Sequence, residues 1–344
     1  MHLEPHLADV GAAFFALEEA VISFLSFACT SLFAALKVRN ADIVMGTTPP
    51  IFQAVSAWLI ALIRRRPFVL EIRDLWPEFA IDMGVLKNPV LIRASRWLER
   101  FLYRHADHLV VNSPAYRDYL IGKSVPAAKI TLVPNGVDPE MFEQATDGPR
   151  VRAQFGLADR FVVTYAGALG LANDLETILR AAERLRDDTK IHFLIVGDGK
   201  ERSSLEAQAK KLNLSNVTFA GPQPKTRMPL VLAASDACVA TLRDIRMFRT
   251  TYPNKVFDYM AAGRPTIVAI DGVIREVVEK SRGGIFVPPG NDAALAEAVL
   301  TLSRDRALAS RMGAAAKEYV TRHFHRQQQA EQLASLLGKL MQAS

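Results

Sequence analysis

The sequence predicts an α/β protein with two doubly wound domains, each a parallel β-sheet covered by helices on both faces. Its 344 residues are about twice the roughly 150 of an average domain. Half of them are hydrophobic and 23% are charged, which provides for a large core and excludes wholesale disorder. Short apolar runs alternate with amphipathic stretches along almost the whole chain, and this alternation is typical of parallel sheets.

A first domain is predicted over residues 1–145, with a helix over 90–104. Its strands are expected at four apolar runs, residues 42–46, 68–72, 108–112 and 130–133. A doubly wound domain normally begins with a strand and a glycine-containing turn, and residues 1–40 contain neither. We therefore expect this domain to be incomplete, either because it is reduced or because the chain starts late.

A break follows the fourth run. Pro134, Asn135 and Gly136 form a strong turn signal, so we assign them to a hinge. A second domain is predicted over residues 146–310, and the C-terminal helices of 311–344 are expected to cross the domain junction. The strands of the second domain are expected at residues 161–165, 191–196, 217–219, 237–240 and 265–269. Its helices are expected at residues 175–186, 201–211, 228–234, 256–262 and 293–304.

An apolar stretch near the N-terminus, residues 21–36, carries no charge over 16 positions, fewer than the roughly 20 needed to span a bilayer. The preceding residues lack the basic region of a secretory signal. We expect a helix that packs on the protein or a partner; contact with a membrane interface and spanning are the alternatives. A second apolar stretch, residues 51–63, ends in three arginines, residues 64–66. We expect these arginines to contact either anionic lipid or solvent.

Composition limits the classes of ligand, partner and cofactor that the protein is expected to use. The net charge of +6 suits phosphate-bearing ligands or an anionic membrane surface, with a solvated basic surface as the alternative. No nucleic-acid-binding motif is present, so we expect no nucleic acid partner. Cys29 and Cys238 are too few for a disulfide framework or a cysteine-rich zinc site, which favours a reduced, cytoplasmic setting. HExxH, DxD and P-loop motifs are absent, so neither metal nor cofactor is expected.

Two glycine-containing turns end neighbouring strands of the second domain. Small residues let a phosphate approach the backbone there, and the N–H groups of a following helix attract negative charge. Since open α/β sheets bind ligands at the carboxyl ends of their strands, we predict a ligand cleft at this edge. Two tight turns, with Asp198 as a helix cap, are the alternative. The residues concerned are Gly167, Leu169 and Gly170 in the first turn, and Gly197, Asp198 and Gly199 in the second.

A basic residue stands at the predicted start of the helix over 256–262. Lys255 lies beside the positive end of the helix dipole, where a cation is unfavourable without an anionic partner, so a phosphate ligand would explain it. Asn254 suits the helix start, and Asp258 follows Lys255 by about one turn and can point to the same ligand. Arg249, from a nearby basic cluster, is assigned to the site as well.

Polar residues also follow the second strand of the first domain. Arg73 and Asp74 stand where that strand gives way to a loop, so they are candidate site residues; a structural ion pair between them is the alternative. His105 and His108 are three positions apart with no further ligand type nearby, and we interpret them as ordinary helix-end histidines.

Five segments together resemble a known family, the retaining glycosyltransferases of family 4, or group 1 transferases. The segments are FVLEIRDLWPE (68–78), VPNGVD (133–138), YAGALG (165–170), VGDG (196–199) and YPNKVFDYMAAGRP (252–265). The resemblance covers roughly residues 20 to 330 and implies the GT-B fold, two Rossmann-like domains facing across a cleft. The sequence is most similar to bacterial O-antigen and capsule transferases, including those that move N-acetyl-fucosamine from a uridine diphosphate carrier.

The resemblance implies that the second domain binds a nucleotide-sugar donor and the first an acceptor. Lys255 would neutralise the diphosphate beside the first glycine turn. Asp258 would hold the ribose, and the backbone around Gly221 would meet the base. Arg73 and Asp74 would lie near the transferred sugar, where many members have a His-Asp pair.

Three departures from the family pattern stand out. Thr250 replaces the first acidic residue of the Glu-x7-Glu motif, which usually contacts the donor sugar. The usual Arg/Lys pair is missing from residues 167–174, so Lys255 and Arg249 would substitute. Relatives also begin earlier, with a strand and a glycine-rich turn.

We therefore hypothesise a metal-independent, retaining glycosyltransferase of hexosyl or N-acetylhexosaminyl type. It would use a UDP-linked donor and a lipid-linked or saccharide acceptor, in bacterial surface polysaccharide synthesis. It would work in the cytoplasm, either free or in peripheral contact with the inner membrane. A nucleotide-binding remnant or partner protein without turnover is the first alternative. A nucleotide-sugar epimerase is the second, for which only Asp74 and Asp258 are conveniently placed acid–base groups.

Overall fold

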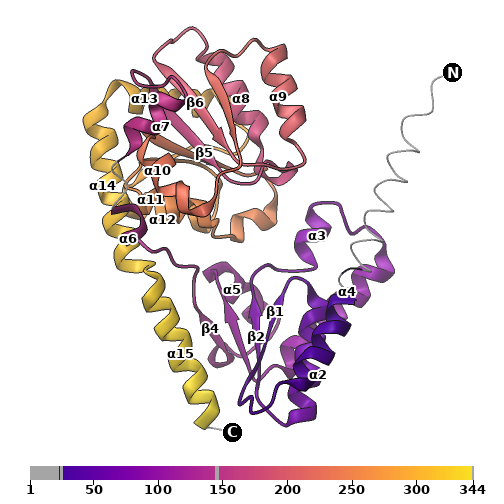
Figure 1. The fold of residues 1–344 in the computed structure, drawn as a ribbon. Helices are drawn as coiled ribbons and strands as arrows, with labels where there is room; N and C mark the ends of the chain where they lie inside the picture. Colours follow the sequence, from indigo (N-terminus) through magenta and orange to yellow (C-terminus); the bar gives the residue numbers. More distant parts are fainter. Residues whose placement is uncertain (1–22, 24–25, 144–146, 343–344) are drawn as a thin grey trace, which may run out of the picture. The chain divides into compact units, whose positions relative to one another are not determined.

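The structure is a computed structural model that describes residues 23, 26–143 and 147–342 (Figure 1). It divides into two compact units, one of Met1–Val133 with Gln332–Ser344 and the other of Pro134–Glu331. The chain passes between the units at Pro134, the first residue assigned to the hinge, and again within its last helix, α15 (Arg326–Gln342). The boundary predicted after residue 145 falls outside the described residues.

The first unit contains a four-stranded parallel sheet in the order β1-β2-β3-β4. The strands are β1 (Val44–Thr48), β2 (Phe68–Ile72), β3 (His108–Val111) and β4 (Ile130–Leu132). Every pairing is parallel, as the apolar runs predicted. Strand β1 begins two residues later than expected and leaves Asp42 outside the strand, in an exposed ion pair with Arg66.

Helices pack against this sheet. They are α2 (Ile51–Arg64), α3 (Glu78–Asp82), α4 (Pro89–His105) and α5 (Pro114–Gly122), followed by the 3-10 turn η1 (Ala127–Lys129). Helices α2 and α4 contact each other through Trp58 and Phe101, whose ring centroids are 4.8 Å apart. The Asn88 side chain accepts from two backbone N–H groups at the start of α4, which explains why that helix begins there.

Part of the N-terminal apolar stretch lies within the described residues. Residues 26–37 are helical, and they pack on α2: Ser56 Oγ donates to the Ala28 carbonyl at 2.8 Å, and Arg64 Nη2 donates to the Leu36 carbonyl at 2.9 Å. The beginning of the stretch, residues 21, 22, 24 and 25, lies outside the described residues. Within the part of the chain that the structure describes, none of the helices combines the length and apolar character needed to cross a bilayer.

The second unit contains a six-stranded sheet in the order β10-β9-β8-β5-β6-β7. The strands are β5 (Phe161–Ala166), β6 (Ile191–Val196), β7 (Val217–Gly221), β8 (Ala237–Thr241), β9 (Thr266–Ala269) and β10 (Gly284–Phe286). All neighbours pair in parallel. The chain adds strands on one side of β5 and then on the other, so the strand order reverses between β5 and β8. Strand β10, which the apolar runs did not predict, is a three-residue edge strand.

Helices cover both faces of this sheet. Residues of β5 alternate between two cores: Val163 and Tyr165 face one, and Val162 and Ala166 face the other. The predicted two-faced arrangement is therefore confirmed for this unit (Figure 1). The elements are α6 (Glu140–Glu143), α7 (Gly148–Gln154), η2 (Leu171–Asn173), α8 (Leu175–Arg184), α9 (Arg202–Lys211), η3 (Lys225–Arg227), α10 (Met228–Ala233), η4 (Arg246–Thr250), α11 (Asn254–Ala261), α12 (Val273–Ser281), α13 (Asp292–Arg304), α14 (Arg306–His323) and the start of α15.

The residues assigned to the hinge pack against the junction between α14 and α15. Val137 N–H donates to the Phe324 carbonyl at 2.8 Å, and Arg326 N–H donates to the Val137 carbonyl at 2.9 Å. A Cβ on Gly136 would lie 2.6 Å from the Arg326 Cα, so only glycine allows this approach. The first and last segments of the second unit are thereby joined.

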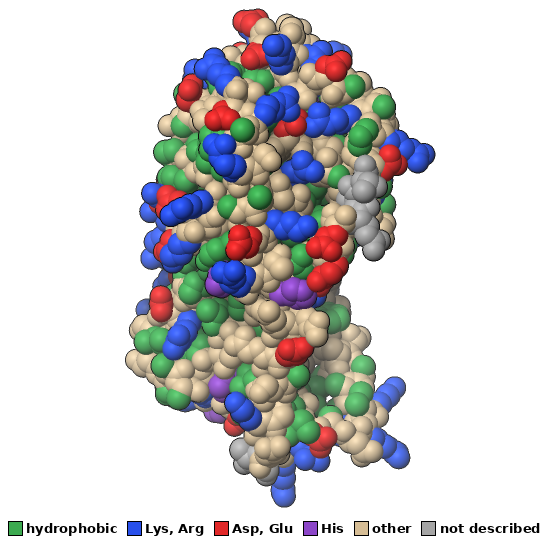
Figure 2. All heavy atoms as spheres, turned by 90° about the vertical axis from the view of Figure 1, so that its left-hand side faces the viewer, with side chains coloured by type: hydrophobic (Ala, Val, Ile, Leu, Met, Phe, Trp, Pro, Cys, Tyr) green, Lys and Arg blue, Asp and Glu red, His purple; other side chains and the backbone are tan. Residues whose placement is uncertain are grey.

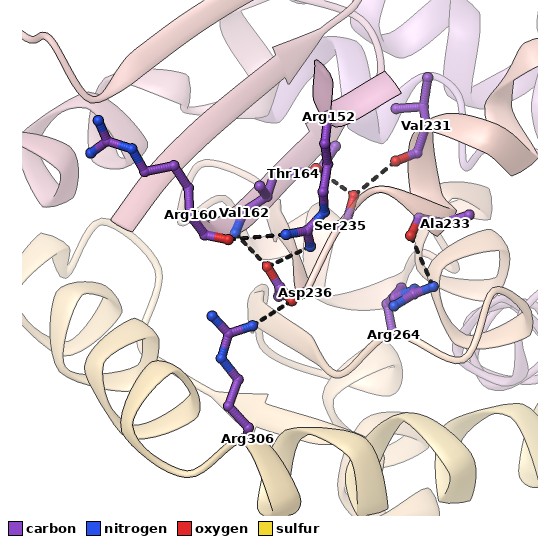
Figure 3. A network of polar contacts seen from close by, with 10 residues as sticks. All are labelled: Arg152, Arg160, Val162, Thr164, Val231, Ala233, Ser235, Asp236, Arg264 and Arg306. Atoms are coloured by element: carbon purple, nitrogen blue, oxygen red, sulfur yellow. Dashed lines mark hydrogen bonds and ion pairs between the residues drawn. The ribbon is translucent and has the colours of Figure 1, made fainter. Parts of the chain in front are cut away.

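Asp236 forms a polar network at the amino ends of β5 and β8 (Figure 3). One carboxylate oxygen accepts from Arg152 Nη2 and from the Val162 N–H, both at 2.7 Å, and the other accepts from Arg306 Nη1 at 2.7 Å. Both arginines lie outside the sheet, on α7 and α14. This network fixes two helices to the sheet, at the edge opposite the glycine turns.

Replacing Asp236 with alanine is therefore expected to lower the free energy of unfolding by about 3 kcal/mol, because it leaves two guanidinium groups and a backbone N–H without their acceptor. Chemical denaturation would measure the change. Asp187→Ala removes an exposed carboxylate and serves as the control. Equal stability of the two variants would contradict the role given to the network.

Candidate active site

The two predicted glycine turns meet at one edge of the second sheet. A Cβ on Gly197, whose φ is +145°, would lie 1.9 Å from the Gly167 carbonyl oxygen. A Cβ on Gly199 would lie 2.3 Å from the Leu169 carbonyl oxygen. Glycine is thus required for the first turn to lie directly on the second.

Backbone hydrogen bonds connect these turns to each other and to β7. Leu169 N–H donates to the Asp198 carbonyl at 2.8 Å, and Gly197 N–H donates to the Gly221 carbonyl at 3.0 Å. The Asp198 side chain accepts from the Gly199 N–H at 2.9 Å, but it does not cap the following helix, because α9 begins at Arg202 with Glu201 at its N-cap position. We call this set, Gly167, Leu169, Gly197, Asp198, Gly199 and Gly221, the glycine edge.

Lys255 reaches the glycine edge from α11. As predicted, it lies in the first turn of this helix, which begins at Asn254. Its Nζ donates to Tyr165 Oη and to Asn173 Oδ1, both at 2.8 Å, and lies 4.4 Å from the centre of the Tyr165 ring. A Cβ on Gly167 would be 3.0 Å from the same nitrogen. The missing side chain at Gly167 therefore leaves room for the ammonium.

The ammonium of Lys255 lies in an electrostatically unusual place. It forms no ion pair with a carboxylate of the described residues. Burial lowers its pKa from the ordinary value for lysine to about 7. The tyrosine beneath it has its pKa raised by burial and remains a neutral phenol, whose hydroxyl donates to the Ala168 carbonyl at 2.8 Å. Two of the three ammonium protons are used, and the third is available to a ligand.

The sheet topology makes this position a natural ligand site. Gly167 follows β5, and α11 belongs to the chain that follows β8, the two strands between which the order reverses. In open α/β sheets, ligands bind outside the carboxyl ends of the strands at such a switch point. The sheet topology and Lys255 therefore both indicate a ligand site at the carboxyl ends of β5 and β8. Because Lys255 is a cation without a carboxylate partner among the described residues, the ligand favoured there is an anion.

Two family models match the chain. "Glycosyl transferase 4-like domain" matches residues 7–136, and "Glycosyl transferases group 1" matches residues 160–305. The chain belongs to the group 1 glycosyltransferases. The resemblance seen in the sequence is thereby confirmed at the level of the family, and the chain is a glycosyltransferase with two parallel-sheet α/β domains of the GT-B type.

Curated relatives are transferases too. "Putative colanic acid biosynthesis glycosyl transferase WcaI" of Escherichia coli (strain K12) is 26% identical over 308 residues, which are 86% of this chain and 74% of the relative. "Probable glycosyltransferase WbjE" of Pseudomonas aeruginosa is 26% identical over 76% of this chain, but the match spans only 66% of that relative, just under two thirds. Alr3699/HepE of Anabaena, solved in complex with UDP, shares the fold: its TM-score is 0.75 at 22% identity, covering 91% of this chain and 82% of that one.

Asp258 lies on α11 of this glycosyltransferase, one turn beyond Lys255, and the two side chains share no hydrogen bond or ion pair among the described residues. Burial raises the pKa of Asp258 to about 6, against the opposing charges of Lys225 and Arg326, while Asp138 adds to the rise. The charged groups that shift the pKa of Asp258 thus include Asp138, which lies next to the hinge. The proposed ribose contact remains a prediction.

Arg249 is engaged elsewhere. It forms ion pairs with Asp244 at 3.0 Å and Asp271 at 3.9 Å, and no contact joins it to Lys255 among the described residues. Its role at the site, as a substitute for the family's Arg/Lys pair, therefore stays a prediction. Gly170 lies beside Asn173, and a Cβ there would make only ordinary contact, at 3.8 Å from Asn173 Nδ2. Asn254 is exposed at the helix start.

Arg73 and Asp74 belong to the first unit and follow β2. The Asp74 carboxylate accepts from Tyr116 Oη at 3.5 Å, and burial raises its pKa, an effect that Arg73 and Tyr116 oppose. Arg73 is exposed, and its backbone is held between the Thr48 carbonyl and the Asn112 side chain. The pair lies at the carboxyl edge of its sheet, as predicted, and its catalytic role is a proposal.

Two residues that position Lys255 escaped the sequence analysis. Tyr165 ends the strand expected at 161–165 and opens the segment YAGALG. Asn173 lies between the first glycine turn and the helix expected at 175–186. Neither carries a charge, so only a tertiary contact reveals that both accept from the ammonium. Within residues 23, 26–143 and 147–342, no three His, Cys, Asp or Glu side chains group as a metal site would; independence from metal remains a prediction.

Proposed function

We propose that this glycosyltransferase moves a sugar, with retention of configuration, from a UDP-linked donor to a lipid-linked or saccharide acceptor in the synthesis of a bacterial cell-surface polysaccharide. The main support for this proposal is that the Lys255 ammonium lies at the switch point of the second sheet and has no carboxylate partner among the described residues. The names of WcaI, a colanic acid biosynthesis transferase, and of HepE in complex with UDP support this choice of donor and product.

The proposed chemistry is electrostatic. As the bond between the sugar and the diphosphate breaks, negative charge develops on the leaving group, and Lys255 stabilises that charge together with the positive end of the α11 dipole. The acceptor hydroxyl attacks on the face that the leaving group vacates and gives its proton to the departing diphosphate oxygen, so configuration is retained without a protein nucleophile. The step requires no metal, because the cation and the backbone dipoles neutralise the diphosphate. Asp74 and Arg73 are proposed to act near the transferred sugar.

Binding and turnover, measured on the same sample, test this proposal. We expect UDP to bind, and a panel of UDP-hexoses and UDP-N-acetylhexosamines to contain one that is consumed only when a lipid extract or oligosaccharide acceptor is added. Turnover should persist in a chelator. Binding with no turnover would favour a nucleotide-binding protein instead. Conversion of one UDP-sugar into another without acceptor would indicate an epimerase.

The pKa of Lys255 predicts how UDP binding depends on pH. Because that pKa is about 7 in the free protein, Lys255 is charged below pH 7 and mostly neutral above pH 8. A bound diphosphate favours the charged form, so binding must take up a proton above pH 7, and the affinity should fall by up to about tenfold for each pH unit from 7 to 9. Calorimetry in two buffers of different ionisation enthalpy measures the uptake. The proton uptake on UDP binding should be lost in Lys255→Ala. If the uptake persists in that variant, a group other than Lys255 takes up the proton.

A further inference from the structure

A basic cavity lies at the amino edge of the first sheet, away from Asp74 at the carboxyl edge. Its volume is about 350 Å³, and it is formed by the end of α4, the end of α5 and the turn before β4. Four of its lining side chains are bases: Arg100, Arg104, Lys123 and Lys129. Nothing in the proposed transfer uses this cavity.

The bases of the cavity are only partly neutralised. The buried carboxylate beside it, Glu99, accepts from Tyr103 Oη and Tyr119 Oη at 3.1 Å each, and it forms an ion pair with Lys123. Lys129 Nζ is held by the last carbonyls of α4. Arg100 and Arg104 have neither an ion pair nor a side-chain hydrogen bond within the described residues, and both are exposed. An anion with several oxygens, such as a phosphate, matches this set of donors.

An exposed apolar strip runs along α4 next to the cavity. Val90, Ala94, Trp97 and Phe101 are spaced by three or four residues, so they share one face of the helix. Val90 and Trp97 are 72% and 60% exposed, and the rings of Trp97 and Phe101 stack with centroids 5.5 Å apart. Beyond Phe101, the end of the adjacent helix α2 adds exposed Leu62 and Ile63.

Unpaired arginines border the apolar strip. Arg93, Arg100 and Arg104 are spaced by seven and four residues and therefore form one line on α4, beside the strip. On α14, by contrast, Arg306 pairs with Asp236 and Arg322 with Glu318, and the face presenting that helix shows red beside blue (Figure 2). On α4, arginines without an acidic partner among the described residues therefore lie beside exposed apolar side chains.

We propose that this face of α4 docks on an anionic lipid bilayer, with the apolar strip at the interface and a lipid phosphate group in the basic cavity. Trp and aliphatic side chains favour the membrane interface, and arginines beside them are attracted to anionic head groups. A protein partner would need a complementary acidic surface, whereas an anionic bilayer supplies phosphate groups and an apolar phase together. The inference rests on the proposed lipid-linked acceptor, and it extends that proposal by naming the surface that reaches the membrane.

Vesicle sedimentation of the full chain tests the docking. Vesicles that contain phosphatidylglycerol should bind the protein, and pure phosphatidylcholine vesicles should bind it far less. Arg100→Ala with Arg104→Ala should weaken binding to the anionic vesicles by roughly 25-fold, since each charge near such a surface contributes about fivefold. Trp97→Ala should weaken it as well. Arg186→Ala with Arg311→Ala removes the same charge from exposed positions in the second unit and should bind like the wild type.

The other outcomes decide against the proposal. If the variant lacking Arg100 and Arg104 bound anionic vesicles as well as the variant lacking Arg186 and Arg311, the net positive charge of the protein, and not the α4 face, would attract the vesicles. Binding of glycerol phosphate in solution without vesicle binding would make the cavity a site for a free phosphate ester. Thermal melting shows whether each variant is folded, and all of them keep the buried Glu99 pair. Sedimentation measures vesicle binding without any sugar transfer. The docking proposal can therefore fail while UDP binding and transfer are observed, and the proposed function can fail while vesicle binding is observed.

Discussion

Replacement of Lys255 by alanine is expected to slow sugar transfer by roughly 30- to 1,000-fold, which corresponds to about 2–4 kcal/mol of lost transition-state stabilisation. The ammonium lies against Gly167 of the glycine edge, and its third proton has no acceptor among the described residues. The loss should appear mainly in kcat, because the charge on the diphosphate grows as the bond breaks. Initial rates over a range of donor concentration measure it.

Stability measurements separate this loss from unfolding. In the folded protein the pKa of Lys255 is lowered, so the unfolded chain binds the proton more tightly between pH 7 and about 10. The wild type therefore gains stability as the pH rises through this window, and Lys255→Ala, which lacks the group, should not. Lys210→Ala, an exposed lysine on α9, should leave rate and stability unchanged. Unchanged turnover in Lys255→Ala would remove this residue from the mechanism.

Gly197→Ala is expected to abolish measurable UDP binding and to lower the melting temperature. The new methyl group would lie 1.9 Å from the Gly167 carbonyl oxygen, and the residue would be held at a φ of +145°, which L side chains rarely adopt. The first glycine turn must then move away from the second. Because Gly167 leaves the space for the Lys255 ammonium, the anion site is lost together with the turn.

A glycine in open space provides the control. A Cβ on Gly338, within α15, meets nothing within 4 Å, so Gly338→Ala should bind UDP like the wild type and melt at the same temperature or slightly higher. Isothermal titration and thermal unfolding of both variants give the comparison. Wild-type affinity in Gly197→Ala would show that the packing of the two turns does not shape the site.

The fold was largely predictable from local pattern. Strands β5 and β6 are six-residue apolar runs followed by glycine turns, and β2 matches its predicted bounds, because a strand buried on both faces leaves a continuous apolar signal. Strand β10 was missed, since three half-buried edge residues give no such signal. The order of the strands is a tertiary property, and local pattern does not contain it.

The site was predictable where charge or conformation marked it. Lys255 was found because a lysine in the first turn of a helix conflicts with the helix dipole, and Gly197 because a glycine at the end of a strand indicates a special turn. Tyr165 and Asn173 were not found, since their importance depends on a contact that spans about half the length of the second unit. Arg249 was assigned for its charge; two carboxylates pair with it, and its role at the site remains a prediction.

The position of bound UDP tests the central claim most directly. A crystal structure of the complex should show a diphosphate oxygen within hydrogen-bonding distance of Lys255 Nζ and beside the Gly167 backbone, at the carboxyl ends of β5 and β8. A nucleotide bound at another edge of the sheet, or on the first unit, would contradict the account.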